Sequence, residues 1–299
     1  MKNSPGRKIS YGIIGCGSVF AKHAEAIRKN KESKLKAVFD IDRTRCEAAA
    51  FEYGCEAKTG LSSMLADKAI DAIIICTPHD THKDLVLKAI RAGKYAICEK
   101  PLCLNSKEGK AILGSRHYDK NVFTVFQARF DPAILFLFEL IESGKLGKVR
   151  LCAVNVRKYR DRAYFQDDWH GSMKRHGGLL FNQGIHALDL MRLVCGEPGK
   201  IFAFSRNLRA FKDIEDMFLA VVEFKNGVLG SVEVTTYAKN KDFENSIFVI
   251  GDRGSIKIGG HTFDKIEQMS LKNDKPAVRK FSKQYLNGHE PFIAAVNDY

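Results

Sequence analysis

The sequence predicts an α/β protein that begins with a doubly wound parallel sheet and continues into an α+β domain with a large open, mainly antiparallel sheet. In the first half, short apolar β-branched runs alternate with helical patterns, which is typical of βαβ units. In the second half, alternating runs flank Asn226-Gly227 and the segment 251–254, which predicts two antiparallel hairpins, the first with a type I′ turn. We therefore expect two domains, residues 1–125 and 126–299.

The first apolar run, residues 9–14, ends at a Gly-x-Gly motif and gives way to a helical pattern that continues to Ile27. The first glycine permits a tight turn, and the second lets the backbone approach a pyrophosphate. A helix that begins near Ser18 presents unpaired N–H groups to that pyrophosphate. Phe20 stands at the third fingerprint position in place of Gly or Ala. The pattern predicts a Rossmann domain with dinucleotide contacts from Gly15, Gly17, Ser18, Val19 and Phe20.

A second strand, residues 34–39, ends in Asp40. An acidic residue about 20 residues after the glycine motif accepts hydrogen bonds from the adenosine ribose hydroxyls and repels a 2′-phosphate. Asp40 therefore predicts NAD as the cofactor. Arg43 and Arg45 are close enough in sequence to hold a 2′-phosphate, so NADP stays the less favoured alternative.

Two further apolar strands end in polar residues. Residues 72–76 lead into Thr77-Pro78-His79, and residues 95–98 lead into Glu99-Lys100-Pro101. Ligands bind at the carboxyl ends of the strands in open α/β sheets, so we expect both segments to face a ligand. A Glu-Lys pair after a single strand is more often an ordinary surface pair. Its place after two βα units favours a catalytic site.

His79 and His82 are three residues apart, a spacing that also occurs in metal sites. They lie where residues that face the nicotinamide are expected. The sequence therefore predicts cofactor contacts there and no metal.

Four motifs together resemble the Gfo/Idh/MocA family of NAD(P)-dependent oxidoreductases: Gly15-Cys16-Gly17, Cys76-Thr77-Pro78 with His82, Ala92-Gly93-Lys94, and Cys98–Leu102. The resemblance covers nearly the whole chain. It implies that Lys100 helps catalysis and that Glu99 binds the nicotinamide ribose. The remaining cofactor contacts are expected from Thr77, Pro78, His79, His82, Lys100 and Gln127.

The second half continues the resemblance, because family members usually show Gly-Gly, three residues, Asp, three residues and His. Here Gly177-Gly178 precedes Asn182 and His186, so an amide replaces the usual carboxylate. Acid–base work then falls on Lys100, with His186 orienting a hydroxyl or passing its proton. Residues four apart share a helix face, so both side chains are expected to point at one substrate. Without the flanking pattern, a hydrogen-bonded core histidine would be the better interpretation of His186.

The stretch Asn182–His186, with Trp169-His170-Gly171 and Ile214-Glu215-Asp216, resembles the branch of the family that oxidises carbon 3 of UDP-N-acetylglucosaminuronic acid in bacterial surface polysaccharide (O-antigen) synthesis. The basic and aromatic segment 156–165 suits a diphosphate, a carboxylate or a sugar ring, although a solvated edge strand and loop would look the same. The expected substrate contacts are Lys100, Arg157, Tyr159, Asn182, Gln183 and His186.

Composition is compatible with a cytoplasmic enzyme. The chain has 299 residues and a net charge of +13, but its lysines are scattered, which argues against nucleic-acid binding and suits an anionic nucleotide substrate. Eight cysteines without a Cys-x-x-Cys pair are expected to be reduced. The apolar run at Ile9 is too short for an export signal, and no run is long enough to cross a membrane.

The resemblance also implies a homodimer or homotetramer formed through the open face of the second sheet. Residues Asn287 to Tyr299 are expected to begin an amphipathic helix that stops early, because relatives usually continue further.

Two other functions stay open at this stage. The first is a dehydrogenase of a simple polyol or sugar, such as inositol. The second is a cofactor-binding sensor without catalysis, because one fold can serve either purpose. Lys100 and His186 favour an enzyme, since a sensor needs neither beside a nicotinamide.

Overall fold

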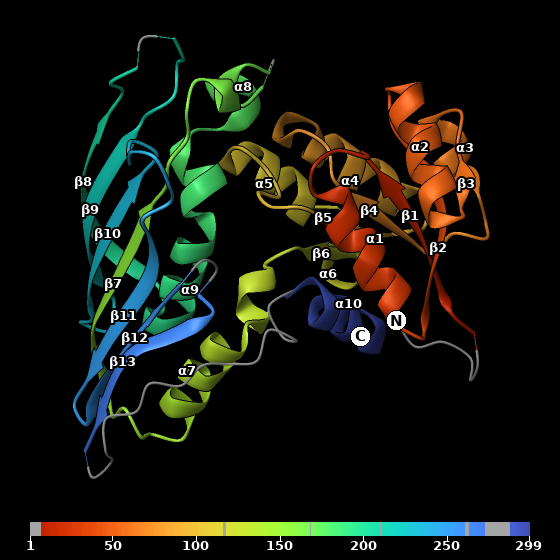
Figure 1. Cartoon of the computed structure of the whole chain (residues 1–299). Coiled ribbons are helices and arrows are strands. Elements are labelled where there is room, and N and C mark those ends of the chain that lie inside the picture. Colours follow the sequence, from red (N-terminus) through yellow and green to blue (C-terminus); the bar gives the residue numbers. More distant parts are fainter. Residues whose placement is uncertain (1–6, 116–117, 168, 210, 261–262, 273–287) are drawn as a thin grey trace. The chain divides into compact units, whose positions relative to one another are not determined.

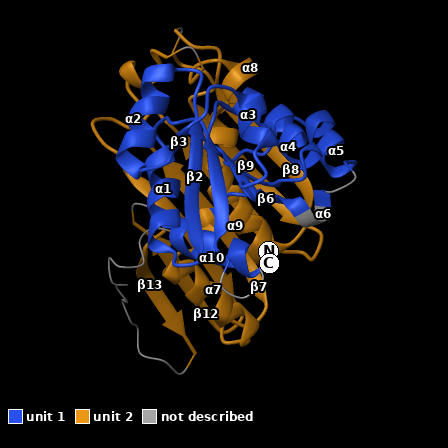
Figure 2. Ribbon diagram, turned by 90° about the vertical axis from the view of Figure 1, so that its right-hand side faces the viewer, with its two compact units in different colours: residues 1–126, 289–299 blue, residues 127–288 orange. Residues whose placement is uncertain are grey.

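The computed structural model describes residues 7–115, 118–167, 169–209, 211–260, 263–272 and 288–299 (Figure 1). The chain divides into two compact units. The first comprises residues 1–126 and 289–299, and the second comprises residues 127–288 (Figure 2). Among the described residues, no helix has the length and apolarity that a membrane span requires.

The first unit is built on a six-stranded parallel sheet of order β3-β2-β1-β4-β5-β6. The order reverses between β1 and β4, which is where doubly wound sheets bind their ligands. This sheet confirms the predicted parallel fold. Its strands are β1 (Ile9–Ile14), β2 (Ser33–Phe39), β3 (Glu56–Ala57), β4 (Ala72–Ile75), β5 (Tyr95–Cys98) and β6 (Val122–Thr124).

Helices connect these strands and cover the sheet. The four residues of β4 are all buried, as a strand covered on both faces requires. The helices are α1 (Phe20–Lys29), α2 (Arg43–Tyr53), α3 (Leu61–Ala66), α4 (His82–Arg91), α5 (Ser106–Leu113) and α6 (Tyr118–Asn121).

The helix α10 (His289–Asp298) belongs to the first unit, although it lies within residues 126–299, which were expected to form the second domain. Its apolar side chains Phe292, Ile293 and Val296 are buried. Asn297 donates a hydrogen bond to Ser33 Oγ (3.0 Å) and accepts one from the Tyr11 hydroxyl. These contacts tie the helix to β1 and β2, which no local pattern could reveal. The expected first residue, Asn287, lies outside the described residues.

Among its described residues, the second unit carries a seven-stranded mixed sheet of order β13-β12-β11-β7-β10-β9-β8, in which β7 and β10 pair in parallel and the other neighbours pair antiparallel. This confirms the expected, mainly antiparallel second sheet. Its strands are β7 (Val149–Arg157), β8 (Pro198–Arg206), β9 (Met217–Phe224), β10 (Leu229–Thr235), β11 (Glu244–Gly251), β12 (Gly254–Gly259) and β13 (Lys265–Leu271).

One face of this sheet forms the core with α7 (Pro132–Glu142) and α9 (Ile185–Cys195). Leu190 and Met191 of α9 belong to the same buried cluster as Val154 and Val232. Side chains alternate along each strand, so every second residue projects from the opposite face. The sheet thus has one covered face and one open face.

The hairpin at Asn226-Gly227 forms between β9 and β10, but its turn is not type I′. A type I′ turn needs positive φ at both central residues, and only Gly227 has it (φ 85°). Phe224 O accepts from Gly227 N (2.9 Å), while Phe224 N donates to Val228 O (2.9 Å). This is the longer connection with a bulge glycine. The second predicted hairpin, across 251–254, joins β11 to β12.

Candidate active site

The glycine turn after β1 leaves a helix N-terminus open. Gly15 has φ 93°, and a Cβ there would lie 2.7 Å from the Cys76 carbonyl oxygen, so the ends of β1 and β4 approach closely. A Cβ at Gly17 would meet no described atom within 4 Å. Helix α1 begins at Phe20, two residues later than expected, and has no side-chain cap or acidic residue in its first turn. Its N–H groups and dipole can therefore receive a pyrophosphate.

The three residues after the motif differ in what they offer a ligand. Ser18 is exposed and Val19 is half-buried. Phe20 is buried, and its ring packs edge-on against Tyr53 with 5.3 Å between the ring centroids. The Phe20 side chain is thus part of the core, and a cofactor contact there would come from its main chain.

Asp40 holds the glycine turn in place. Its carboxylate accepts hydrogen bonds from Cys16 N (2.7 Å) and Asp42 N (2.8 Å). Arg45 lies 3.8 Å from the same carboxylate and 3.4 Å from Asp42, while Arg43 pairs with Glu47. Each carboxylate oxygen can accept more than one hydrogen bond, so Asp40 keeps acceptor capacity for a ribose.

His82 links the loops that follow β4 and β5. Its Nδ1 lies 2.6 Å from the Pro101 carbonyl oxygen, and its Nε2 lies 2.8 Å from the Thr77 carbonyl oxygen. Thr77 in turn shares a 2.6 Å hydrogen bond with Thr81. Both ring nitrogens of His82 therefore face main-chain oxygens, an arrangement that fixes the loops and leaves neither nitrogen for a metal. His79 is buried beside it, with 5.6 Å between the ring centroids.

Glu99 and Lys100 follow β5 directly, and the Lys100–Pro101 peptide is cis. Burial lowers the pKa of the Lys100 amine from its usual value, while the Glu99 charge opposes part of that effect. A lysine that loses its proton more easily is a better general base. By contrast, Lys94 of the Ala-Gly-Lys motif is structural, because its amine donates to the carbonyl oxygens of Asp67 and Ile70 (2.7 Å each).

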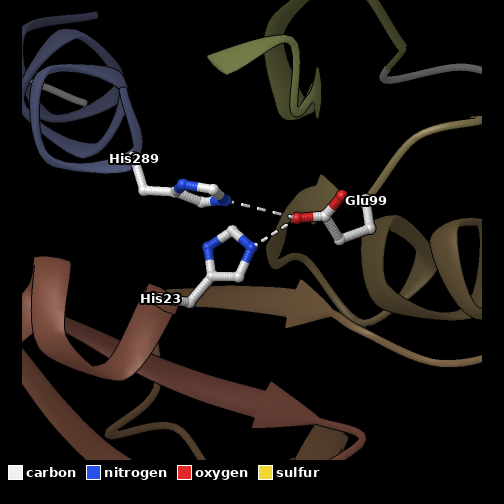
Figure 3. A group of neighbouring side chains, drawn as sticks. All are labelled: His23, Glu99 and His289. Atoms are coloured by element: carbon white, nitrogen blue, oxygen red, sulfur yellow. Dashed lines mark hydrogen bonds and ion pairs between the residues drawn. The ribbon is translucent and has the colours of Figure 1, made fainter. Parts of the chain in front are cut away.

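The partners of Glu99 were not predicted from the sequence. Figure 3 shows His23 of α1 and His289 of α10 turned toward one oxygen of this carboxylate, at 2.7 Å and 3.7 Å from their Nε2 atoms. The three donor atoms lie within 4.8 Å of one another, so the group could hold a metal ion. In the sequence, His23 stands within the helical pattern that follows the glycine motif, and such a histidine alone predicts only a core residue. His289 carried no signal, because it is remote in sequence.

In the second unit, Tyr164 joins the side chains of the expected substrate residues. Asn182 donates to the Tyr164 hydroxyl (2.7 Å), and its amide nitrogen lies 2.6 Å from His176 Nε2. Gln183 also donates to the Tyr164 hydroxyl (3.2 Å) and lies 3.4 Å from Arg160 Nη2. The Asn182 side-chain amide thus contacts both Tyr164 and His176, and its carbonyl oxygen is of the kind that accepts a hydrogen bond from a hydroxyl.

An aromatic cluster surrounds this network. The rings of Trp169 and His170 contact each other at a tilt of 34°, with 3.8 Å between their centroids. The centroid of the Tyr164 ring lies 4.4 Å from that of His170. His176 lies within 5.8 Å of both Trp169 and His170. These rings are a surface on which a sugar or a base can stack. Tyr164 and His176 were not among the predicted contacts.

His186 lies at the start of α9, with Gln127 beside it (Nε2 to Nε2, 3.4 Å). A bidentate ion pair between Arg129 and Asp189 (2.5 and 2.7 Å) joins the 127–130 turn to α9. It thereby holds Gln127 beside His186. Asn182 lies in a π-helical turn, Leu180–Gly184, just before α9. Asn182 and His186 are four residues apart across this turn, and the contacts described for them are to different residues.

Arg157 is placed differently from the expectation. It alternates along β7 with Val154 and Val156, which are buried beneath α9, so it projects from the opposite face of the sheet. There it makes two 2.5 Å contacts to Glu233 and pairs with Glu244. Its positive charge is therefore neutralised by two neighbouring strands.

Tyr159 and Arg160, just after β7, are anchored by Asp242, which accepts from Tyr159 N (2.9 Å) and Arg160 Nη1 (2.9 Å). Arg160 also lies over the Tyr164 ring, 5.2 Å from its centroid. Arg160 is thus the arginine that the fold brings to the Asn182–Gln183 network. It lay inside the predicted basic segment but was not singled out.

Residues 9–127 match the model of the oxidoreductase family with an NAD-binding Rossmann fold, and residues 134–257 match that of the GFO/IDH/MocA C-terminal domain. A relative that spans both regions is the inositol 2-dehydrogenase of Rhizobium meliloti, which is 30% identical over 96% of this chain and 88% of that protein. The chain belongs to the Gfo/Idh/MocA family. It is an NAD-dependent oxidoreductase of the sugar and polyol dehydrogenase type.

Two further proteins match nearly the whole chain. The scyllo-inositol 2-dehydrogenase (NAD(+)) of Bacillus subtilis is 30% identical over 97% of this chain and 90% of that protein. The structure of the WlbA dehydrogenase from Bordetella pertussis, solved with NADH and UDP-GlcNAcA, superposes with a TM-score of 0.88 at 25% identity. That match covers 99% of this chain and 89% of the WlbA chain.

Proposed function

We propose that this enzyme oxidises carbon 3 of UDP-N-acetylglucosaminuronic acid, in the synthesis of a bacterial surface polysaccharide such as O-antigen. The observation that carries the proposal is the Asn182–Gln183–Tyr164 network with Arg160 attached, because it combines hydroxyl acceptors with an arginine. Asp242 holds Nη1 of Arg160, and we propose that the Nη2 side of the guanidinium receives the carboxylate. The likeness to a WlbA dehydrogenase solved with UDP-GlcNAcA supports it.

In this proposal the first unit binds NAD, which supplies a hydride acceptor. The open N-terminus of α1 and the backbone at Gly17 receive the pyrophosphate, Asp40 holds the adenosine ribose, and Glu99 holds the nicotinamide ribose. Lys100 takes the proton of the reacting hydroxyl. His186 and Asn182 orient that hydroxyl, and neither needs to be charged for this.

We expect a panel of sugars to separate the substrate candidates. UDP-N-acetylglucosaminuronic acid should raise the melting temperature in the presence of NAD and should reduce NAD, because a ligand that binds only the folded state stabilises it. Differential scanning fluorimetry and NADH absorbance would measure both effects. UDP-N-acetylglucosamine, which lacks the carboxylate, should act more weakly. Faster reduction of NAD by myo-inositol would establish the polyol alternative, which the two inositol dehydrogenase relatives favour.

Replacing Arg160 with Gln extends this test to the carboxylate. A charge-assisted hydrogen bond contributes about 1.5–3 kcal/mol, so KM for the acidic sugar should rise about 10- to 100-fold. Arg192→Gln is the matched control, since Arg192 is exposed and pairs with Glu197 near the end of α9. Equal effects of the two changes would remove Arg160 from the substrate site.

We further propose that the open sheet face binds a second copy of the chain, giving a homodimer or homotetramer. Phe202 and Phe204 of β8 are directly opposite Val221 and Leu219 of β9, and all four are more than half exposed. Such a contiguous apolar patch on a sheet is typical of an interface between subunits. The enzyme would act in the cytoplasm, where the eight thiols, all free in the structure, stay reduced.

Phe202→Glu should shift the protein toward the monomer, because it puts a charge into the centre of this patch. Light scattering coupled to size exclusion would measure the mass. Phe51→Glu is a matched control, since Phe51 is 92% exposed on α2, far from the patch in sequence. A wild-type protein that is monomeric at micromolar concentration would contradict the interface.

A further inference from the structure

Glu99, next to Lys100, lies in a buried group with His23 and His289, two side chains to which the proposed chemistry gives no role. The exposed fractions of the three residues are 0%, 7% and 3%. An ionised carboxylate is costly to bury unless hydrogen bonds compensate it. Here His23 Nε2 lies 2.7 Å from Glu99 Oε1, and the Lys100 main-chain N–H donates to Glu99 Oε2 (3.2 Å). Both oxygens thus have a donor.

The ring geometry gives the two histidines different tasks. The rings of His23 and His289 meet edge to face with 4.8 Å between their centroids (Figure 3). His23 contacts the carboxylate directly, while His289 Nε2 is 3.7 Å from the same oxygen. The Nδ1 of His23 is buried and has no hydrogen-bond partner among the described residues. Metal-bound histidines almost always have that second nitrogen held by a partner, so a hydrogen-bonded carboxylate explains the group better than a metal ion does.

Electrostatics act on Glu99 from several elements. Burial raises the pKa of its carboxyl, but the hydrogen bond from His23 and the nearby His289 outweigh burial and hold the pKa well below its usual range. Burial lowers the pKa of His289, while Glu99 opposes part of that effect. The other titratable groups that interact electrostatically with Glu99 or with this cluster are Lys22, Cys76, His82, Cys98 and Lys100.

We propose that His23 and His289 are positioning residues for the cofactor, which keep the Glu99 carboxylate ionised and fixed so that it accepts hydrogen bonds from the two hydroxyls of the nicotinamide ribose. The inference rests on the proposed ribose role of Glu99. His23 supplies the donor, and His289 packs against His23 and excludes water from the carboxylate. An ionised Glu99 is a double acceptor for a diol, whereas a protonated one offers fewer acceptor sites.

The test is the pH dependence of NAD affinity, measured on the full chain by titration calorimetry between pH 5.5 and 8.5. In the wild type, the lowered pKa keeps Glu99 ionised throughout this window, so Glu99 should add no slope. In His23→Leu the donor is gone and burial raises the pKa of Glu99. The ionised form is then lost as pH falls through that raised pKa. Below it, Kd should increase up to about tenfold for each pH unit.

Three matched variants separate this effect from a loss of packing. His23→Gln keeps an N–H donor and should restore a flat profile. His23→Leu combined with Glu99→Gln has no carboxylate to titrate and should be flat, although weaker. His289→Phe keeps the ring packing without its nitrogen and should give a smaller slope than His23→Leu, because of its longer distance. It also keeps the inference testable if His23→Leu does not fold.

The possible outcomes distinguish the inference from the function on which it rests. If Glu99→Gln alone leaves NAD affinity unchanged, Glu99 does not hold the ribose and the proposed function is wrong at that point. If Glu99→Gln weakens NAD but both histidine variants keep flat profiles, the positioning role is overturned. One equivalent of a divalent metal in the purified protein, lost in His23→Leu, would also overturn it and establish a metal site.

Discussion

Lys100→Met should reduce turnover by about 10²- to 10⁴-fold while NAD binding is largely kept. A general base contributes about this much to a reaction, and methionine fills a similar volume without an amine. Lys100 directly follows Glu99 at the carboxyl end of β5, where the parallel sheet presents its ligand-facing residues. NAD affinity by calorimetry and turnover by NADH absorbance would separate binding from chemistry.

The assignment of Lys100 as the general base also predicts how kcat/KM changes with pH. As a base, Lys100 must be neutral, so kcat/KM should rise with pH through the pKa of its amine and then level off. Burial lowers that pKa from its ordinary value, and the Glu99 charge opposes burial only in part. This rise in kcat/KM should therefore occur at a pH below the pKa of a free lysine, about 10.4. It should be absent in Lys100→Met.

His186→Asn is the control for this assignment. His186 has Gln127 beside its Nε2, and in the proposed function it orients a hydroxyl, so its loss should cost less than that of Lys100. A Lys100→Met protein with near-normal turnover, together with an inactive His186→Asn protein, would assign the proton to His186.

Gly15→Ala and Gly17→Ala should fail in different ways. Alanine at Gly15 must adopt φ 93° and would place its Cβ 2.7 Å from the Cys76 carbonyl oxygen. The positive φ alone costs about 1–2 kcal/mol, and the clash with backbone adds to this. Gly15→Ala should thus lower the melting temperature without any ligand and should abolish NAD binding, because the two strand ends must separate.

Alanine at Gly17 meets no described atom within 4 Å, so the unliganded protein should keep its melting temperature. It should nevertheless bind NAD more weakly, because the methyl group occupies the space through which a pyrophosphate reaches the backbone. Scanning fluorimetry with and without NAD measures both effects. Equal stabilisation of Gly17→Ala and wild type by NAD would mean that the cofactor does not approach this turn.

Local sequence patterns were sufficient for the first unit, because its strands are buried runs and its turns carry glycine where φ is positive. The strand that ends before Asp40, the buried run of β4 and the helix that closes before Gly93 all form close to their predicted bounds. Each depends on residues adjacent in the chain. The type I′ assignment at Asn226-Gly227 was wrong, since two residues do not specify the length of a loop.

The polar and charged residues of the second unit were recognisable as candidate site residues in the sequence, but the residues that they contact were not. Arg157 is basic and follows a strand, yet the register of β7 with β10 and β11 directs it to the sheet face opposite α9. A π-helical turn that the sequence did not predict contains Asn182 and precedes α9. Neither the register nor the turn follows from local propensity, because both are set by packing against distant strands.

By itself, the sequence determined the parallel sheet, the glycine turn, the acid after β2 and the Glu-Lys pair after β5, because short-range periodicity and turn chemistry encode them. Only the tertiary structure decided that α10 returns to the first unit and that His289 and His23 hold Glu99. Glu99 and His23 are 76 positions apart, and Tyr11 and Asn297 are 286 apart. Such contacts exist only once the sheet has assembled and both segments bury their apolar faces against it.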